Sequence, residues 1–384
     1  MPQDGDEFAV VLAAVAEAVG LQEGSAGVRR VVRAIAALEP APTRDVSRRA
    51  GLPVPLVAAV NNELRARGVV DSGRPARLTG YGRTLVDALH TPDPTCSCCA
   101  GATVVVPDVL RPVVERLDEL VAAEPRADLT LDQSHSTGET KVRRVLHLLR
   151  VDALPVGAAL FVGDDDLMSL AFAHVGEALG VRLVDRTVVL DVHRPLLEFL
   201  RAELGAAGTA YEHDLREPIP PDLRGAFDLA VTDPPYTVEG ARLFLSRAVE
   251  GLRPHAGCDV LFSFGPKGPD DALAVQRAVV ELDLATVCMY RNFNAYLGAD
   301  IHGGRSTLHH LTTTRSTAPV VAGSYAGDLY TADKRGAARG YQCLACKERL
   351  VVGPGERWAM IEQLKQAGCP ACGKRRFRPS SLVR

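Results

Sequence analysis

Two short segments decide the fold expected for this chain: LFVGDDDL at Leu160–Leu167 and FDLAVTDPPY at Phe227–Tyr236. In each segment, an apolar run of the length that suits a buried strand breaks into acidic residues. Ligands of open α/β sheets bind outside the carboxyl ends of the strands. If both runs are strands, the two acidic clusters meet at that edge. We therefore expect one pocket lined with carboxylates, which favours a cationic ligand.

The segment 151–313 alternates between strand-like and helix-like patterns. Seven strands are expected, at Ala159–Val162, Thr187–Leu190, Thr209–Tyr211, Leu229–Thr232, Val260–Ser263, Thr286–Tyr290 and Thr307–Thr313. Helices are expected at Met168–Leu179, Arg194–Leu204, Ala241–Gly251 and Asp271–Glu281. This alternation predicts an α/β fold with a mostly parallel sheet and helices on both faces. Seven strands with an antiparallel last strand resemble the Rossmann-like fold of class I methyltransferases, and the strand order follows by that analogy.

Composition and charge narrow the class of protein. The chain has 384 residues, 47% of them hydrophobic, so about two or three domains with full cores are expected. A net charge of −3 argues against a protein that mainly coats nucleic acid. No apolar run approaches the ~20 residues that span a bilayer, and Met1–Glu7 is unlike a signal peptide. We expect a cytoplasmic protein whose nine cysteines are metal ligands or buried thiols.

Residues 1–90 are expected to form an N-terminal helical domain of the winged-helix type. Apolar residues recur at helical spacing in 28–38, Val54–Gly68 gives another helix, and Val69–Thr79 suggests a two-stranded wing. If the domain binds nucleic acid, the candidates for phosphate contact are Arg48, Arg49, Arg65 and Arg67. A dimerisation or lid module is favoured instead, because the turn helices carry no concentrated basic face.

The rest of the chain divides into a linker with connecting helices (91–150), the α/β catalytic domain (151–315), a polar linker (316–340) and a cysteine-containing end (341–384). The first linker holds three thiols, Cys96, Cys98 and Cys99. They lack nearby partners for a full ligand set, so a buried or reactive cluster is preferred to a metal site.

Two CxxC pairs, Cys343 with Cys346 and Cys369 with Cys372, lie 22 residues apart. A two-residue gap lets one ion take both sulfurs, and two such pairs supply the four thiolates of a structural zinc site. We therefore predict a zinc ribbon whose coordination is complete and leaves no position for water.

A helix is predicted to start at Ser136, because Ser136 and Glu139 have capping-box spacing, and to run to about Arg150. Asp132 and Gln133 precede it. They either start the helix or provide polar contacts to a pocket.

Three aspartates, Asp164, Asp165 and Asp166, follow Gly163, where nucleotide-binding folds face an anion. Two carboxylates about 5 Å apart repel by about 3 kcal/mol at an effective dielectric of ~20, roughly a hundredfold in affinity. That repulsion disfavours S-adenosylmethionine, which carries a carboxylate. The ammonium tail of decarboxylated S-adenosylmethionine, or a polyamine, would be attracted. Helix capping is the alternative role, but it requires only one of the three.

Further acids are expected to bind a nucleoside donor. Asp191 ends the second strand, where an acid usually accepts hydrogen bonds from a ribose. Asp214 follows the third strand and is the candidate partner of the adenine amino group.

The turn Asp233-Pro234-Pro235-Tyr236 resembles the tetrapeptide of amino-methyltransferases. The prolines fix the backbone, the aspartate can accept a hydrogen bond from an attacking amine, and the tyrosine offers a π face to a cation. An alkylamine has a pKa of about 10.4, so about one molecule in a few thousand is neutral at pH 7. A nearby carboxylate is therefore expected to accept the proton. The remaining requirement is in-line positioning of nitrogen, carbon and sulfonium.

Four motifs together resemble the branched-chain polyamine synthases, which are N4-bis(aminopropyl)spermidine synthases: GDDD at 163–166, HDLR at 213–216, DPPYT at 233–237 and FNAY at 293–296. The resemblance implies transfer of aminopropyl groups from decarboxylated S-adenosylmethionine to the secondary amine of spermidine, giving a branched polyamine. The C-terminal zinc ribbon departs from the family pattern. That departure leaves open another amine acceptor, including one on a larger molecule.

The motifs and the resemblance together give the candidate site. The candidate catalytic residues are Asp165, Asp233 and Tyr236. The donor-binding candidates are Gly163, Asp164, Asp166, Asp191 and Asp214. The acceptor-binding candidates are Asp233, Pro234, Pro235, Tyr236, Phe293, Asn294 and Tyr296. The resemblance implies that the last three close the acceptor side.

We expect a polyamine substrate and a homodimer, and neither a nucleic-acid nor a membrane partner is favoured. The first alternative is an S-adenosylmethionine-dependent N-methyltransferase acting on a protein or nucleic acid, which the three aspartates disfavour. The second is a polyamine-responsive DNA-binding regulator that combines the winged helix with the zinc ribbon. The lack of a basic face argues against it.

Overall fold

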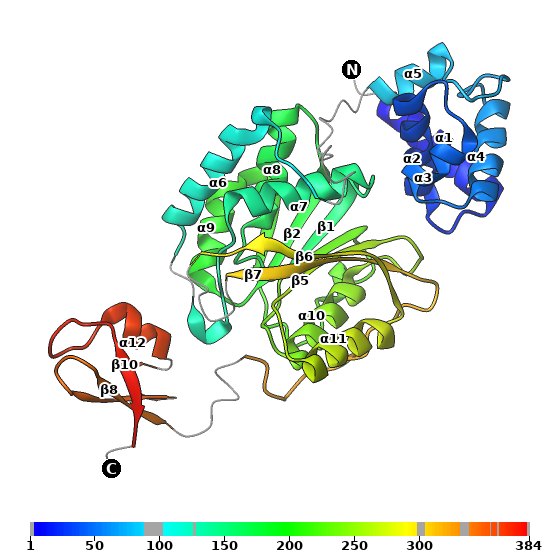
Figure 1. The fold of residues 1–384 in the computed structure, drawn as a ribbon. Helices are drawn as coiled ribbons and strands as arrows, with labels where there is room; N and C mark the ends of the chain where they lie inside the picture. Colours follow the sequence, from blue (N-terminus) through cyan, green and yellow to red (C-terminus); the bar gives the residue numbers. More distant parts are fainter. Residues whose placement is uncertain are drawn as a thin grey trace.

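A computed structural model describes residues 4–381 of the chain, except 88–102, 126–127, 298–303, 331–337, 354 and 359–360. Figure 1 shows a helical N-terminal part, a central sheet covered by helices and a small C-terminal part with strands. The predicted cluster of Cys96, Cys98 and Cys99 lies outside the described residues.

The central part is built on a seven-stranded sheet. Its strands are β1 (Val156–Val162), β2 (Val184–Asp191), β3 (Gly208–Glu212), β4 (Leu229–Thr232), β5 (Asp259–Phe264), β6 (Leu284–Ala295) and β7 (Arg305–Thr313). They are ordered β3-β2-β1-β4-β5-β7-β6. β7 runs antiparallel to both of its neighbours, whereas β1 to β5 are parallel. The seven predicted strands and the antiparallel last strand are confirmed.

Helices cover both faces of this sheet (Figure 1). One face carries α6 (Arg111–Ala123), α7 (Gly138–Arg150), α8 (Met168–Leu179) and α9 (Arg194–Leu204); the other carries α10 (Val238–Gly251) and α11 (Pro269–Glu281). Neighbouring residues of β1 enter different apolar clusters, Phe161 on one face and Leu160 on the other. Strands buried on both faces have continuous apolar sequences, which made their positions predictable.

The strand register brings three strand ends together at one edge. Val162 of β1 pairs with Leu190 of β2 and with Thr232 of β4. The residues that follow these three positions, including Asp191 and Asp233, therefore leave the sheet side by side at its carboxyl edge.

Helix α7 begins later than the capping-box spacing predicts. Its N-cap is Thr137, whose Oγ1 accepts a hydrogen bond from Thr140 N at 3.2 Å. Ser136 donates its backbone N–H to Asp166 at 2.6 Å. The prediction that Ser136 caps the helix is therefore wrong, because its backbone already binds an acid of the site. The predicted end at Arg150 is confirmed.

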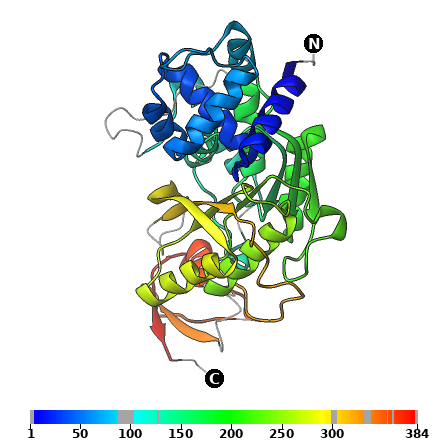
Figure 2. The same cartoon turned by 90° about the vertical axis from the view of Figure 1, so that its right-hand side faces the viewer.

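The N-terminal part has an apolar core of its own. It contains α1 (Asp4–Val19), α2 (Gly24–Leu38), α3 (Thr43–Ala50), α4 (Val54–Ala66) and α5 (Gly80–Asp87). Between α4 and α5, an antiparallel bridge joins Val70 to Leu78. A partly buried ion pair between Arg33 and Asp152 links this part to the central part. Figure 2 shows the N-terminal and C-terminal parts on opposite sides of the central sheet.

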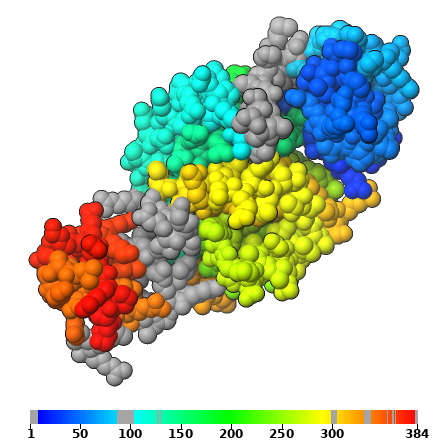
Figure 3. Space-filling view, in the orientation of Figure 1, coloured from blue at the N-terminus to red at the C-terminus, as the bar shows by residue number. Residues whose placement is uncertain are grey.

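The C-terminal part is a three-stranded antiparallel sheet with one short helix. Its elements are β8 (Arg339–Cys343), β9 (Arg349–Val352), α12 (Ile361–Ala367) and β10 (Phe377–Ser380). Trp358 and Leu364 are in its small core, and Figure 3 shows it as a separate lobe.

Across the described segments, no single helix is long and apolar enough to cross a membrane. Phe8–Val19 and Gly24–Leu38 pass that test only as a pair, which is bent by 106°.

Candidate active site

The carboxyl end of β1 continues into a glycine that the local geometry requires. Gly163 has a φ of +72°, in the left-handed region that other residues rarely adopt. A Cβ at this position would also lie only 3.3 Å from the ring of Phe244. The chain can therefore turn sharply here, and the three aspartates that follow have different partners.

Asp164 binds the first turn of helix α8, whose N-cap residue is Leu167. Its carboxylate accepts hydrogen bonds from Met168 N at 2.7 Å and from Ser169 Oγ at 2.5 Å. Its own backbone N–H donates to Asp191 Oδ2 at 3.2 Å. Carboxylates at this position stabilise the helix N-terminus. Because Asp164 is only 1% exposed, the donor contact predicted for it receives no support from this geometry and stays a prediction.

Arg144 of α7 connects Asp166 with Asp233. Its Nη1 donates to Asp166 Oδ2 at 2.6 Å, and its Nη2 donates to Asp233 Oδ2 at 3.1 Å. The guanidinium is buried, and its Nε donates to Asn294 Oδ1 at 2.9 Å. The structure thus brings the GDDD segment and the DPPY turn together, with a buried cation between them.

Asp165 is the member of the three that faces the cleft. Its carboxylate accepts a hydrogen bond from Ser134 N at 2.9 Å, and it forms no ion pair with another described residue. Burial, followed by the negative charges of Asp166 and Asp233, raises the pKa of Asp165 well above its usual value. An ammonium group in the cleft would relieve this unfavourable charge.

A narrow cleft, open to solvent on one side, lies at this edge of the sheet. It is lined by Leu131, Asp132, Gln133, Gly163, Asp165, Asp191, Val192, His213, Leu215, Asp233, Pro235, Phe244 and Tyr330. Four of these residues are aspartates, and they come from four different segments. The presence of Asp132 and Gln133 supports their role as polar contacts to a pocket over a role in starting α7.

Two tyrosines lie at the DPPY turn between β4 and α10: Tyr236 belongs to the turn, and Tyr296 follows the end of β6. The Tyr296 hydroxyl donates to the Asp233 carboxylate and accepts from Arg144 Nη2 at 2.9 Å. The ring of Tyr236 lies edge-on to that of Tyr296, with centroids 6.5 Å apart. Gly265 makes room for Tyr236, since a Cβ there would lie 2.3 Å from the ring. Arg144 and Tyr296 thus hold the carboxylate of Asp233 in place before any ligand binds.

The acids of the site titrate in different pH ranges. Burial, reinforced by the charge of Asp166, raises the pKa of Asp233 to about 7. Burial acts in the same direction on Asp166, but Arg144 and Lys141 outweigh it and lower the pKa of that carboxyl. Asp166 therefore stays ionised, whereas Asp233 changes its charge near neutral pH. Neighbouring carboxyl groups with separated pKa values are typical of sites that move protons.

Four polar residues behind the cleft were missed by sequence reasoning: Arg144, Lys141, Glu124 and His135. Lys141 is fully buried on α7. Burial and then the charge of Asp165 raise the pKa of Glu124 to about 10. His135 Nδ1 lies 3.2 Å from Glu124 Oε2. The one available signal was the spacing of Lys141 and Arg144, which share a helical stripe with apolar residues of α7.

Eight of the predicted residues do not line the cleft: Asp164, Asp166, Asp214, Pro234, Tyr236, Phe293, Asn294 and Tyr296. Asp214 has a side chain that is 45% exposed and accepts a hydrogen bond from Arg216 N at 2.9 Å. Phe293 is buried beneath Arg143, whose Cζ lies 4.2 Å from the ring centroid. Asn294 is buried behind the guanidinium of α7. Direct ligand contacts for these residues remain predictions without geometric support.

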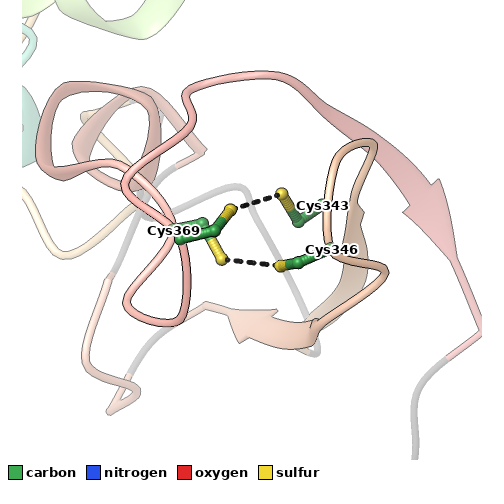
Figure 4. Close-up of side chains that lie close together, drawn as sticks. Cys343, Cys346 and Cys369 are labelled. Carbon is green, nitrogen blue, oxygen red and sulfur yellow. Dashed lines mark hydrogen bonds between the residues drawn. The ribbon is translucent and has the colours of Figure 1, made fainter.

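The two CxxC pairs meet in the C-terminal part, where Cys343 and Cys346 face Cys369 from a neighbouring loop (Figure 4). Sγ of Cys343 lies 3.6 Å from Sγ of Cys372, and Sγ of Cys346 lies 3.5 Å from Sγ of Cys369. Four thiolates bound to zinc in a tetrahedron are about 3.8 Å apart. The set therefore fits one zinc-sized ion.

The sheet order and the acidic cleft at its carboxyl edge define a class: a Rossmann-like fold of the class I methyltransferase type with a small-molecule site. The family model described as the branched-chain polyamine synthase A C-terminal domain matches residues 112–338, which is more than half of the chain. The chain therefore belongs to the branched-chain polyamine synthase family.

Individual proteins are also similar to this chain. The N(4)-bis(aminopropyl)spermidine synthase of Thermococcus kodakarensis is 33% identical over 258 residues, covering 64% of this chain and 71% of the relative. An uncharacterized protein of Methanocaldococcus jannaschii is 28% identical over 382 residues, covering 97% of this chain and 93% of the relative. The branched-chain polyamine synthase of Thermus thermophilus, solved with N4-aminopropylspermidine and 5'-methylthioadenosine, has a TM-score of 0.52 at 24% identity. That alignment covers 86% of this chain and 98% of the solved chain and supports a common fold.

Proposed function

We propose that this protein is an aminopropyltransferase that uses decarboxylated S-adenosylmethionine and the secondary amine of a spermidine-like polyamine to make a branched polyamine. The observation that carries this proposal is the set of four aspartates around one cleft: Asp132, Asp165, Asp191 and Asp233. Donor tail and acceptor are both cations at neutral pH. The names of the relatives and the ligands of the Thermus enzyme support the same reaction.

Selection of the donor is assigned to Asp165. Asp166 and Asp233 share a cationic partner in Arg144, whereas Asp165 forms no ion pair with a described residue. In its ionised form, Asp165 would repel a donor carboxylate about 5 Å away by about 3 kcal/mol, which disfavours S-adenosylmethionine roughly a hundredfold. An ammonium at the same distance gains a comparable amount.

Asp233 is the proposed proton acceptor. The protonated secondary amine first gives up a proton, because only the neutral nitrogen has a lone pair, and a carboxylate with a pKa raised to about 7 by burial and by Asp166 is matched to receive it near neutral pH. The neutral nitrogen then attacks the propyl carbon, the carbon–sulfur bond breaks, and sulfur leaves with the bonding electron pair as the neutral thioether, which leaves a tertiary ammonium product. Arg144 and Tyr296 hold this carboxylate in place. They act as positioning residues.

Mass spectrometry of reactions with each donor tests this function. We expect spermidine to gain about one or two aminopropyl groups from decarboxylated S-adenosylmethionine. Methyl transfer from S-adenosylmethionine to any amine, with no aminopropyl product, would instead establish the methyltransferase alternative. The matched variant Asp165→Asn should lose much of the preference between the two donors in calorimetric binding.

The terminal parts receive more specific assignments within the same proposal. Four converging thiols support a structural zinc ion at Cys343, Cys346, Cys369 and Cys372. The helices α2, α3 and α4, followed by the Val70–Leu78 bridge, support a winged-helix module. Arg65 donates to Asp71 O at 3.0 Å, and Arg67 pairs with Glu63, so these arginines serve the module's own structure. These internal contacts favour a structural role for the winged-helix module over DNA binding. We propose the protein itself as a homodimer.

A further inference from the structure

A second group of metal-type side chains lies in the central part, away from the acidic cleft. His147 Nε2 is 3.1 Å from His310 Nδ1 and 3.8 Å from Cys288 Sγ. The three potential ligand atoms all lie within 4.8 Å of one another. Both histidines are buried, and Cys288 is partly exposed. None of the three residues lines the cleft.

Strand register explains this convergence. Cys288 of β6 and His310 of β7 are direct cross-strand partners, so their side chains project from the same face of the sheet. Helix α7 contributes His147 from above that face, where its ring packs edge-on against His310 with centroids 5.1 Å apart. Three separate elements thus direct one ligand atom each toward a common point.

The orientation of His310 matches that of a metal ligand. Its Nε2 lies 2.9 Å from Asp259 Oδ1. When Nε2 carries the proton and donates it to this carboxylate, Nδ1 is left with its lone pair facing the other two residues. Histidines bound to metals usually donate their second ring N–H to a carboxylate or carbonyl in this way.

The distances also fit an ion. Tetrahedral zinc, with bonds of about 2.0–2.1 Å to nitrogen and about 2.3 Å to sulfur, places two nitrogens about 3.4 Å apart and nitrogen about 3.6 Å from sulfur. The distances of 3.1 and 3.8 Å lie within a few tenths of an ångström of these values. Without an ion, His147 Nε2 can donate a hydrogen bond to His310 Nδ1. The buried Nδ1 of His147 has no hydrogen-bond partner among the described atoms, whether or not Nε2 binds an ion.

We propose that His147 Nε2, His310 Nδ1 and Cys288 Sγ bind a divalent transition metal ion of the zinc type, distinct from the ion of the four-cysteine set. Binding displaces the proton of the Cys288 thiol, and a water molecule takes the fourth position. The role is structural. His147 lies three residues after Arg144 on α7, while β6 and β7 carry Asn294 and Ser306, which support the active site. The ion therefore links α7, which carries Arg144, to β6 and β7, which carry the residues that position Arg144.

Metal counting on the full chain tests this proposal. After removal of metal and reloading with zinc, wild-type protein should hold about two ions per chain, and Cys288→Ala about one. Cys343→Ser/Cys372→Ser should also hold about one, and the triple variant none. His309→Asn is the matched control, because His309 neighbours His310, points to the other face and packs on Phe262. It should keep both ions.

Cobalt gives an independent readout that does not depend on activity. In the Cys343→Ser/Cys372→Ser background, cobalt should produce thiolate-to-metal absorption that disappears in the added Cys288→Ala variant. Zinc should raise the melting temperature of that background, and circular dichroism identifies any variant that fails to fold. The proposal is overturned if folded wild-type protein binds one ion and Cys288→Ala leaves that number unchanged. Loss of an ion in His309→Asn would count equally against it.

Discussion

Arg144 Nη2 lies 3.1 Å from Asp233 Oδ2, in a buried contact between helix α7 and the turn that follows strand β4. The same guanidinium binds Asp166. Breaking a buried pair from one side leaves a charge without compensation, which typically costs about 3–5 kcal/mol. We therefore expect Arg144→Ala to lower the free energy of unfolding by about that amount, measured by urea denaturation.

Arg143→Ala is the control for this change. Arg143 is the preceding residue and lies over the ring of Phe293. Loss of such a cation–π contact costs about 1 kcal/mol. The importance of the Arg144–Asp233 pair would be refuted if both variants unfolded at the same urea concentration.

Two of the three consecutive aspartates, Asp164 and Asp165, should have different effects on stability and donor binding when each is substituted. Asp165→Asn removes the charge that faces the cleft but retains an acceptor for Ser134 N. We expect donor affinity to fall by roughly a hundredfold, the effect of about 3 kcal/mol, with little change in stability. Calorimetric binding of the donor, together with thermal melting, measures both quantities.

Asp164→Ala should behave in the opposite way. Asp164 binds the first turn of α8 through Met168 N and Ser169 Oγ. Loss of such hydrogen bonds to a helix N-terminus costs about 0.5–2 kcal/mol. Stability should therefore fall by that amount while the folded protein keeps most of its donor affinity. Equal loss of donor affinity in both variants would contradict the division of roles.

The centre of the sheet could be predicted from sequence because β1, β2 and β4 are buried on both faces toward their carboxyl ends. The runs around Leu160, Val189 and Val231 are continuous apolar segments bounded by glycine or acid. Their parallel arrangement then fixes the edge at which the following acids meet. The shared cleft of Asp165 and Asp233 follows from that topology.

Arg144 could not be predicted, because its role depends on contacts between residues far apart in the chain. Its partners Asp233 and Tyr296 lie 89 and 152 residues away. Nearly every residue of α7 from Thr140 to Leu149 is buried, so the helix has no polar face from which a functional side chain stands out. The predicted cap at Ser136 failed for a similar reason: Asp166 competes for its backbone N–H from 30 residues away.

Cys343→Ser should remove about one metal ion per chain and unfold the C-terminal part locally. That part has a small core, so its strands depend on the four thiols that hold β8 near the loop after α12. Metal analysis and limited proteolysis of residues 338–381 measure the two effects. Cys258→Ser is the control: Cys258 is a buried thiol outside both proposed metal sites. A Cys343→Ser protein with unchanged metal content would exclude the zinc ribbon.

Glu124 gives the chain a predictable pH dependence of stability. Burial and the charge of Asp165 raise the pKa of Glu124 to about 10, from 4.5 in the unfolded chain. Between these values the folded state holds a proton that the unfolded state has released. The contribution of Glu124 to stability is therefore complete below about pH 4.5 and is lost as the pH rises toward about 10.

Glu124→Gln removes this titration and keeps the shape of the side chain. The free energy of unfolding should therefore decline less steeply with pH in the variant than in the wild type, by up to about 1.4 kcal/mol per pH unit. Urea denaturation at about pH 6, 7.5 and 9 measures the difference. Glu139→Gln, at a side chain that is 51% exposed, should keep the wild-type slope. Parallel curves for wild type and Glu124→Gln would mean that Glu124 is ionised in the folded protein, and the buried acidic cluster would then need another source of neutralising charge.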